Sequence, residues 1–228
     1  MFIQRYLNKL LKRNIIFQDK LRTQPISNVF GLERGTPIDR YYIEQFLKKY
    51  NNYISGNVLE ISENKYSKKF GTNVSSYEIL SYDDSNKKAT IIGDLTKLET
   101  LPDNKIDCFI CTQTLNFIFD VQKAIEGSYK LLKPNGCLLC TVSGISQISR
   151  YDMVRWGDYW RFTDLSIKLL MEKTFGTDNV EITVYGNVLA AKAFMDGLSI
   201  EDLPDVSLLN QSDEDYQITI GIRAIKKN

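Results

Sequence analysis

Histidine is absent from this chain of 228 residues. The side chain that most often acts as a general base near neutral pH is therefore missing, and a carboxylate or a tyrosine would have to take that role. A compact cluster of aspartate and histidine that would hold a metal ion is missing too. The sequence therefore indicates no metal-dependent chemistry.

An excess of charge of one sign is also lacking. Lysine and arginine number 29 against 28 aspartates and glutamates, which gives a net charge of +1. Domains that bind nucleic acid usually carry a clear basic excess. We therefore expect no nucleic-acid partner, although Lys9, Lys12 and Arg13 form a local basic patch.

Long hydrophobic runs do not occur near the amino terminus. Residues 1–21 place apolar and charged side chains at helical spacing, which predicts neither a signal peptide nor a transmembrane segment. An amphipathic arm of this kind would pack on the domain, on a partner or on a membrane surface, and we expect the first. A cytoplasmic location is the default expectation.

Four cysteines are present, in two pairs with two residues between their members: Cys108 with Cys111, and Cys137 with Cys140. That spacing occurs in zinc ribbons. The residues between each pair are apolar and typical of strands, however, and residues three apart on a strand point to opposite faces. We therefore predict four free, buried thiols and no zinc.

Predicted strands and helices alternate along the chain, without internal repeats or low complexity. The expected strands are 57–61, 76–80, 88–92, 106–111, 137–142, 180–185 and 216–225, and the expected helices are 38–47, 121–132, 165–175 and 188–194. Such alternation is typical of an α/β domain with a mostly parallel sheet and helices on both faces. Residues 1–50 would form a helical arm and cap, and residues 51–228 a Rossmann-like domain.

The first of these strands ends abruptly. Glu60 lies within the apolar run, and Ser62 begins a polar turn directly after it. In an open α/β sheet, ligands bind outside the carboxyl ends of the strands. Glu60 would then fix a hydroxyl or ammonium group of a nucleotide-like ligand. The alternative is that Glu60 only ends a strand at the surface.

Several landmarks in this order resemble class I S-adenosylmethionine-dependent methyltransferases. They are residues 58–60 with their terminal acid, Asp94 after a third strand, residues 107–115, and the turn 131–136 leading into the fifth strand. The turn, Leu-Lys-Pro-Asn-Gly within those residues, is the most specific. The resemblance covers residues 57–142 well. It implies a seven-stranded Rossmann-like sheet with an antiparallel last strand, and S-adenosylmethionine as cofactor with S-adenosylhomocysteine as product.

The resemblance also implies positions for the cofactor. Glu60 would face its amino-acid end, and Asp94 its adenine. The remaining predicted cofactor residues are Ser62 in the first loop, Asp83 or Asp84 at the ribose, Leu95 near the adenine, and Thr112 and Gln113 at the crevice.

The sequence departs from the family in the loop after Glu60. Ser62, Asn64 and Tyr66 occupy places where the family has glycine. Asn64 tolerates a left-handed backbone and Ser62 is small, but Tyr66 fits neither explanation, and we expect it to be a packed aromatic. This departure leaves a second hypothesis open, a non-catalytic binding or scaffold protein with a degenerate cofactor loop.

Residues 143–163 contain both tryptophans, three arginines and two aspartates. We expect this segment, a lid insertion at about 143–164, to cover the methyl group. Aromatic faces stack on sugars or planar groups, and arginine binds carboxylate or phosphate. The predicted acceptor-binding residues are Tyr151, Arg155, Trp156, Trp160 and Arg161. The alternative is an aromatic subdomain whose Arg–Asp pairs are satisfied internally.

The lid also holds the candidate bases. Methyl transfer from a sulfonium depends mainly on the alignment of the acceptor oxygen, the methyl carbon and the sulfur. The one further group that the acceptor would need is a base that takes its proton. Asp158 and Tyr159 are the predicted catalytic residues, with Asp152 as a further candidate. Apolar neighbours would raise the pKa of Asp158, whereas an ion pair with Arg155 or Arg161 is its alternative role.

The overall pattern resembles bacterial methyltransferases found with glycosyltransferases in cell-surface polysaccharide (capsule) synthesis. That resemblance implies methylation of an oxygen on a glycan or glycan-linked acceptor. It also implies association with glycan-synthesis enzymes.

Overall fold

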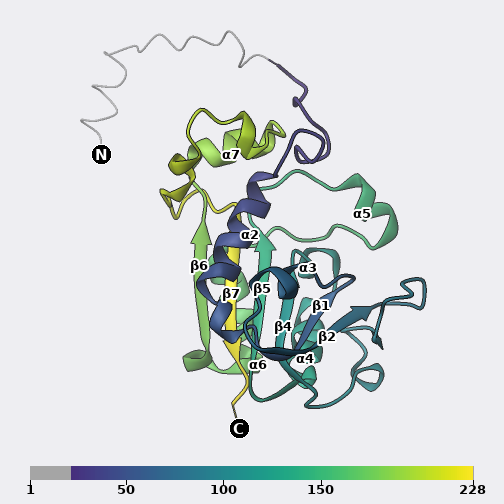
Figure 1. Ribbon diagram of the computed structural model, residues 1–228. Helices are drawn as coiled ribbons and strands as arrows, with labels where there is room; N and C mark the ends of the chain where they lie inside the picture. Colours follow the sequence, from purple (N-terminus) through teal and green to yellow (C-terminus); the bar gives the residue numbers. More distant parts are fainter. Residues whose placement is uncertain (1–21, 228) are drawn as a thin grey trace.

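The structure, a computed structural model, describes residues 22–227. Seven strands form one sheet in the order β3-β2-β1-β4-β5-β7-β6. Their bounds are β1 Gly56–Ile61, β2 Val74–Ser81, β3 Ile91–Ile92, β4 Ile106–Thr112, β5 Leu132–Ser143, β6 Val180–Tyr185 and β7 Thr219–Ile225. Neighbouring strands are parallel except where β7 pairs with β5 and β6 (Figure 1). This confirms the predicted sheet.

Helices cover both faces of the sheet. They are α2 Ile38–Lys49, α3 Lys65–Phe70, α4 Val121–Leu131, α5 Arg150–Arg155, α6 Asp164–Phe175 and α7 Val188–Met195. Apolar side chains of α4 and α6 join one core cluster, and those of α2 and α3 join a second cluster on the opposite face (Figure 1). Phe46 of α2 lies against Gly221 of β7, where any larger side chain would meet its ring.

The cysteines follow the alternation of β4 and β5. Cys108 and Cys137 lie in the core cluster under α2, whereas Cys111 and Cys140 lie in the opposite cluster. All four are buried and free. Cys108 lies directly opposite Cys137, and Cys111 opposite Cys140, on the neighbouring strands β4 and β5. The predicted free thiols on opposite faces are confirmed. Within residues 22–227, no cluster of three or more His, Cys, Asp or Glu side chains could hold a metal ion.

Three predicted boundaries are wrong. The strand expected at 216–225 begins only at Thr219, because Tyr216 closes a turn with Asp213. The strand expected at 88–92 is reduced to the two residues of β3, because Ala89 lies in a turn. The expected turn at 133–136 lies inside β5, which begins at Leu132 beside Ile106. The β4–β5 register shifts at this point, and Asn135 takes a positive φ of 64° that accommodates the extra residues.

The amino-terminal arm expected at 1–21 lies outside the described residues. Among the helices that the structure describes, none is both long and apolar enough to cross a membrane.

Candidate functional site

The carboxyl ends of the parallel strands meet along the upper edge of the sheet in Figure 1. Backbone hydrogen bonds continue past the strand ends, from Ser62 N to Leu80 O (2.9 Å) and from Gln113 N to Thr141 O (2.8 Å). The strand order places the predicted cofactor residues along this edge, from Asp94 after β3 to Gln113 after β4. Residues that follow four different strands thus share one edge, where this fold is expected to bind its ligand.

Glu60 is only 2% exposed, so the alternative that it ends a strand at the surface is wrong. Its carboxylate accepts hydrogen bonds from the backbone N–H of Tyr66 (3.1 Å) and Ser67 (2.6 Å), and from the Ser67 hydroxyl. Burial raises the pKa of Glu60 above its ordinary value, although these hydrogen bonds act in the opposite direction. The carboxylate joins β1 to the first turn of α3, and a cofactor would compete with these bonds.

The loop after Glu60 keeps one feature of a glycine loop. Ser62 has a positive φ of 63°, whereas Asn64 has φ −131° and precedes the first residue of α3. The left-handed residue is therefore Ser62 and not Asn64. Tyr66 stacks on Phe70 at 6.3 Å between ring centroids, which confirms the packed aromatic. The Asn86 amide, which the sequence did not single out, holds the loop by donating to Ser62 O (2.8 Å).

The acids after β2 and β3 differ in exposure. Asp83 and Asp84 lie in an exposed loop, where hydrogen bonds from Ser85 hold the pKa of Asp83 below its ordinary value. Asp94 is more enclosed, with its side chain 19% exposed. Its Oδ1 accepts from the backbone N–H and the hydroxyl of Thr96, both at 2.8 Å. This turn orients the Asp94 carboxylate beside the buried Leu95.

A network of polar side chains connects the ends of β4 and β5. Gln113 has a φ of 48°, and its Oε1 accepts from the Ser143 hydroxyl (2.7 Å) and the Asn116 amide (3.4 Å). Its Nε2 is buried without a hydrogen-bond partner among the described residues. Asn116 is 2% exposed and its Oδ1 accepts from Ser143 N (3.3 Å). A buried asparagine between Leu115 and Phe117 is a signal that the sequence analysis overlooked.

The returning part of the lid docks on the loop after β4. The carbonyl oxygen of Asn116 accepts from the backbone N–H of Tyr159 (2.9 Å) and of Trp160 (3.2 Å). The Trp160 indole N–H donates to the carbonyl oxygens of Ile118 and Phe119, both at 3.2 Å. Asn116 therefore links the lid to Gln113 at the strand ends.

The tip of the lid reaches the loop after β2. The Trp156 ring contacts the Tyr82 ring at 6.0 Å between centroids and 70° between planes. The lid is anchored at β5, Tyr82 follows β2, and β1 and β4 lie between these two strands. The segment thus crosses above the ends of β1 and β4. On its surface, the Arg155 guanidinium lies 3.5 Å from the centroid of the Tyr151 ring.

Asp158 does not have the raised pKa that was expected for a catalytic base. Its side chain is fully buried and forms two hydrogen bonds with Arg161, at 2.6 and 3.0 Å, and one with Ser149 N at 2.8 Å. Burial alone would raise the pKa of Asp158, but the hydrogen bonds from Arg161 and Ser149 hold it below its ordinary value. The expected raised pKa is wrong. The ion pair with Arg161 is the observed arrangement, and it makes Asp158 unsuitable as a general base.

Arg161 is engaged on several sides. Besides Asp158, it donates to the carbonyl oxygens of Ser146 (3.4 Å), Gln147 (2.5 Å) and Trp160 (2.8 Å). Binding an acceptor through this guanidinium would require these contacts to break. Asp152 is engaged too, because its Oδ2 accepts from the Ser149 hydroxyl at 2.5 Å. Tyr159, which is 49% exposed, is the remaining candidate base of the lid.

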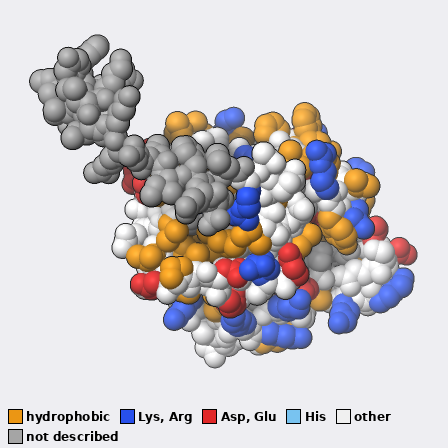
Figure 2. All heavy atoms as spheres, turned by 90° about the horizontal axis from the view of Figure 1, so that it is seen from above, with side chains coloured by type: hydrophobic (Ala, Val, Ile, Leu, Met, Phe, Trp, Pro, Cys, Tyr) orange, Lys and Arg blue, Asp and Glu red, His pale blue; other side chains and the backbone are white. Residues whose placement is uncertain are grey.

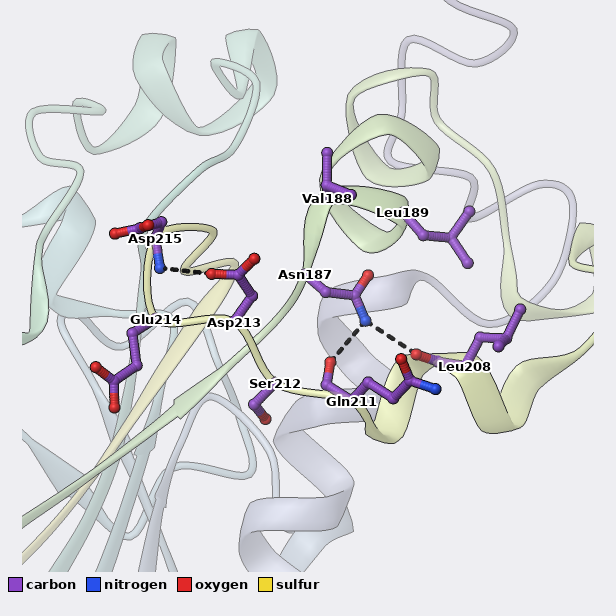
Figure 3. Close-up of a pocket in the computed structure, with 9 residues that line it drawn as sticks. All are labelled: Asn187, Val188, Leu189, Leu208, Gln211, Ser212, Asp213, Glu214 and Asp215. Atoms are coloured by element: carbon purple, nitrogen blue, oxygen red, sulfur yellow. Dashed lines mark hydrogen bonds between the residues drawn. The ribbon is translucent and has the colours of Figure 1, made fainter. Parts of the chain in front are cut away.

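Two cavities are lined by residues other than the predicted cofactor residues. One of 790 Å³ lies between the start of α7 and residues 208–215 and contains none of the predicted site residues (Figure 3). The other, of 480 Å³, borders the lid at Trp160 and Arg161. Figure 2 looks down on this end of the molecule and shows hydrophobic side chains gathered in several groups between lysines and arginines.

Sequence and structure comparisons agree on one kind of domain. Residues 54–140 match the family described as methyltransferase domain. No curated protein sequence matches the chain.

Similar solved structures extend over more of the chain. A SAM-dependent methyltransferase from Archaeoglobus fulgidus is 13% identical, with a TM-score of 0.51 over 82% of this chain and 94% of that one. One from Mesorhizobium loti is 13% identical, with a TM-score of 0.54 over 83% and 98%. Phosphoethanolamine N-methyltransferase 2 from Haemonchus contortus, in complex with S-adenosyl-L-methionine, is 16% identical, with a TM-score of 0.55 over 95% of this chain and 61% of that one.

The structural likeness covers 82–95% of this chain, whereas the family match covers residues 54–140. The family match supports a methyltransferase enzyme, whereas the solved structures, at 13–16% identity, show the fold alone. Residues 54–140 thus match a methyltransferase domain, within a fold shared with S-adenosylmethionine-dependent methyltransferases.

Proposed function

We propose that this protein transfers a methyl group from S-adenosylmethionine to an oxygen of a glycan or glycan-linked acceptor. The observation that carries the proposal is the path of the lid, which leaves β5 and meets Tyr82 beyond β2. This path encloses the edge of the sheet where a methyltransferase domain binds its cofactor.

The residues at this edge fit the cofactor. Asp83 and Asp84 offer exposed carboxylates to the ribose hydroxyls, and Asp94 offers its Oδ2, which lies 3.8 Å from Lys97 Nζ, to the adenine amino group. The unpartnered Gln113 Nε2 is a donor at the end of β4 that a ligand acceptor atom would satisfy. Glu60 fits less well, because its carboxylate is already bonded to α3. When bound, the cofactor supplies an electrophilic methyl group on a sulfonium.

The chain's own residues would orient the acceptor and exclude water. Tyr151, Trp156 and Trp160 present aromatic rings from the lid, which suit the apolar faces of sugars. Tyr159 would accept a hydrogen bond from the acceptor hydroxyl and orient its oxygen toward the methyl group, since Asp158 is held by Arg161. These roles, the cytoplasmic location and an association with glycan-synthesis enzymes are parts of the proposal.

One observation favours a second candidate, a non-catalytic protein that kept the fold. The Glu60 carboxylate is satisfied inside the protein, and serine replaces the first loop glycine. In that case the crevice would not bind S-adenosylmethionine with useful affinity.

Calorimetry with S-adenosylmethionine and S-adenosylhomocysteine separates the two candidates. Losing the hydrogen bonds of Asp94 should cost roughly 1–3 kcal/mol, so Asp94→Ala should weaken binding about 5- to 150-fold. Asp103→Ala, which removes an exposed acid paired with Lys130, is the matched control and should not change it. Absence of heat from the wild-type protein at millimolar ligand would reject the enzyme.

Trp160→Ala tests the acceptor side. Because Trp160 belongs to the lid, the variant should lower acceptor turnover more than cofactor affinity. Mass spectrometry of reactions with candidate sugar nucleotides identifies the acceptor and gives the turnover. Equal losses of cofactor affinity and turnover would contradict the assigned role.

A further inference from the structure

The 480 Å³ cavity beside the lid has no role in the proposed reaction so far. It lies where α4 and α6 begin, next to the returning part of the lid. It is lined by Phe119, Asp120, Val121, Gln122, Trp160, Arg161, Phe162, Ser166 and Leu170. Its volume is that of a site for a small molecule.

The walls of this cavity are mainly apolar. Phe119 is 70% exposed and stacks on Trp160, with 5.9 Å between centroids and 30° between planes. Tyr159 meets Phe119 edge-on at 5.4 Å. Val121 and Phe162 are buried in the core behind these rings. An exposed phenylalanine of this size is unfavourable in water, and covering it would contribute to binding.

The polar side chains of the lining are bonded within the protein. Asp120 accepts from Lys123 N (3.2 Å), Gln122 donates to Thr174 (2.9 Å), and Ser166 and Arg161 bond to Thr163 and Asp158. The Gln122 amide oxygen alone lacks a partner among the described residues, and it is enclosed by protein. The cavity therefore offers little to a polar ligand.

The same contacts favour a flexible chain over a flat ring. Trp160 and Tyr159 pack on parts of the Phe119 ring, which stays 70% exposed, while Val121 and Leu170 add aliphatic groups to the lining. A lining of mixed aliphatic and aromatic groups makes non-directional contacts, which a flexible chain can follow. A hydrocarbon chain matches such a surface.

The cavity is connected through hydrogen bonds to the end of β4, where the cofactor is proposed to bind. Tyr159 and Trp160 both donate their backbone N–H to Asn116 O, and the Asn116 amide bonds Gln113 at the end of β4. One molecule would therefore place a polar end at the strand ends and an apolar end in the cavity.

We infer that the cavity binds a hydrocarbon chain attached to the acceptor glycan, so that the acceptor is an amphiphilic molecule. This inference rests on the proposed function for the polar end. The cavity's own binding is independent of methyl transfer.

Calorimetry with glucose and with alkyl glucosides of increasing length, below their micelle concentrations and without cofactor, tests the inference. Each buried methylene should strengthen binding up to about fourfold, and the gain should stop once the cavity is filled. Phe119→Ala should lose several-fold of the octyl glucoside affinity. Leu169→Ala is the matched control, because Leu169 is also exposed, on α6, but does not line the cavity.

Three results would overturn the inference: equal binding of glucose and octyl glucoside, equal losses in Phe119→Ala and Leu169→Ala, or tighter binding of phenyl than of hexyl glucoside. The last would indicate an aromatic ligand. Circular dichroism of each variant shows that it is folded. Because no cofactor is present, failure of S-adenosylmethionine binding would reject the proposed function and leave this measurement unaffected.

Discussion

Two buried carboxylates, Glu60 and Asp158, illustrate how the partner of an acid decides its behaviour. Both are removed from solvent at the same edge of the sheet, one beneath the first loop and the other inside the lid. Glu60 is bonded by neutral donors, and burial raises its pKa. Asp158 is bonded by a guanidinium, and its pKa is lowered despite its burial.

The difference shows what burial alone predicts and what it does not. A raised pKa was expected for Asp158 from apolar neighbours, but burial raises the pKa of a carboxyl group only when no cation in contact outweighs it. Glu60 has the environment that was predicted for Asp158. Its hydrogen bonds hold α3 against β1, whereas those of Asp158 join Ser149 and Arg161, two parts of the lid.

The largest effect should follow from breaking the charged pair. Arg161→Ala leaves the Asp158 carboxylate buried without a cation. For a fully buried pair the loss is roughly 3–5 kcal/mol, and the 28% exposure of Arg161 reduces our expectation to about 2–3 kcal/mol. Urea denaturation measures the free energy of unfolding.

Arg155→Ala is the control for this variant, because Arg155 is exposed and contacts only the Tyr151 ring and carbonyl among the described residues. Its cost should be about 0.5–1 kcal/mol. If both variants lose equal stability, the buried pair has no special role. Limited proteolysis would show whether Arg161→Ala opens the lid alone.

The contributions of the two acids to stability should change with pH in opposite directions. The folded state holds a proton on Glu60 more tightly than the unfolded state does. Its contribution to stability is therefore full below the ordinary value of 4.5 and is lost as the pH rises through the raised pKa. For Asp158, the contribution is present above 3.8 and is lost as the pH falls through the lowered pKa.

Glu60→Gln and Asp158→Asn make these contributions measurable. The stability difference between wild type and Glu60→Gln should shrink as the pH rises, and that for Asp158→Asn should shrink as the pH falls. Each slope is at most about 1.4 kcal/mol per pH unit. Urea denaturation across pH 3–8 provides the values, and slopes of the same sign would contradict the comparison.

The smallest effect should come from the loop beside Glu60. Ser62→Gly relieves the left-handed strain but adds freedom to the unfolded chain, so stability should change by less than about 1 kcal/mol. Ser62→Val should cost about 1–2 kcal/mol, since a β-branched residue disfavours this φ. Thermal denaturation compares the three proteins, and a stable valine variant would show that the loop can rearrange.

The fold could be predicted because its strands are short apolar runs between turn signals. The antiparallel β7 followed from the resemblance to methyltransferases, and the opposed cysteines of β4 followed from their spacing. The length of β3 could not be predicted, because only Ile91 and Ile92 pair with β2, and nothing in residues 88–90 excludes a longer strand.

The candidate site was predictable only as a set of positions. The acids at strand ends could be placed from the sequence, but their partners come from distant segments. Asp158 has Arg161 nearby in sequence, yet Arg155 is as near, and only the lid's path selects between them. Asn116 bonds residues from β5 and the lid, so its importance depends on tertiary structure.

The paired thiols of β4 and β5 have a practical consequence. Burial raises the pKa of Cys108, and that of Cys137 to about 12, so neither sulfur is available to a labelling reagent while the sheet is closed. The central strands must separate before any of the four can react. The rate of thiol modification of the unaltered protein therefore reports how often β4 and β5 separate.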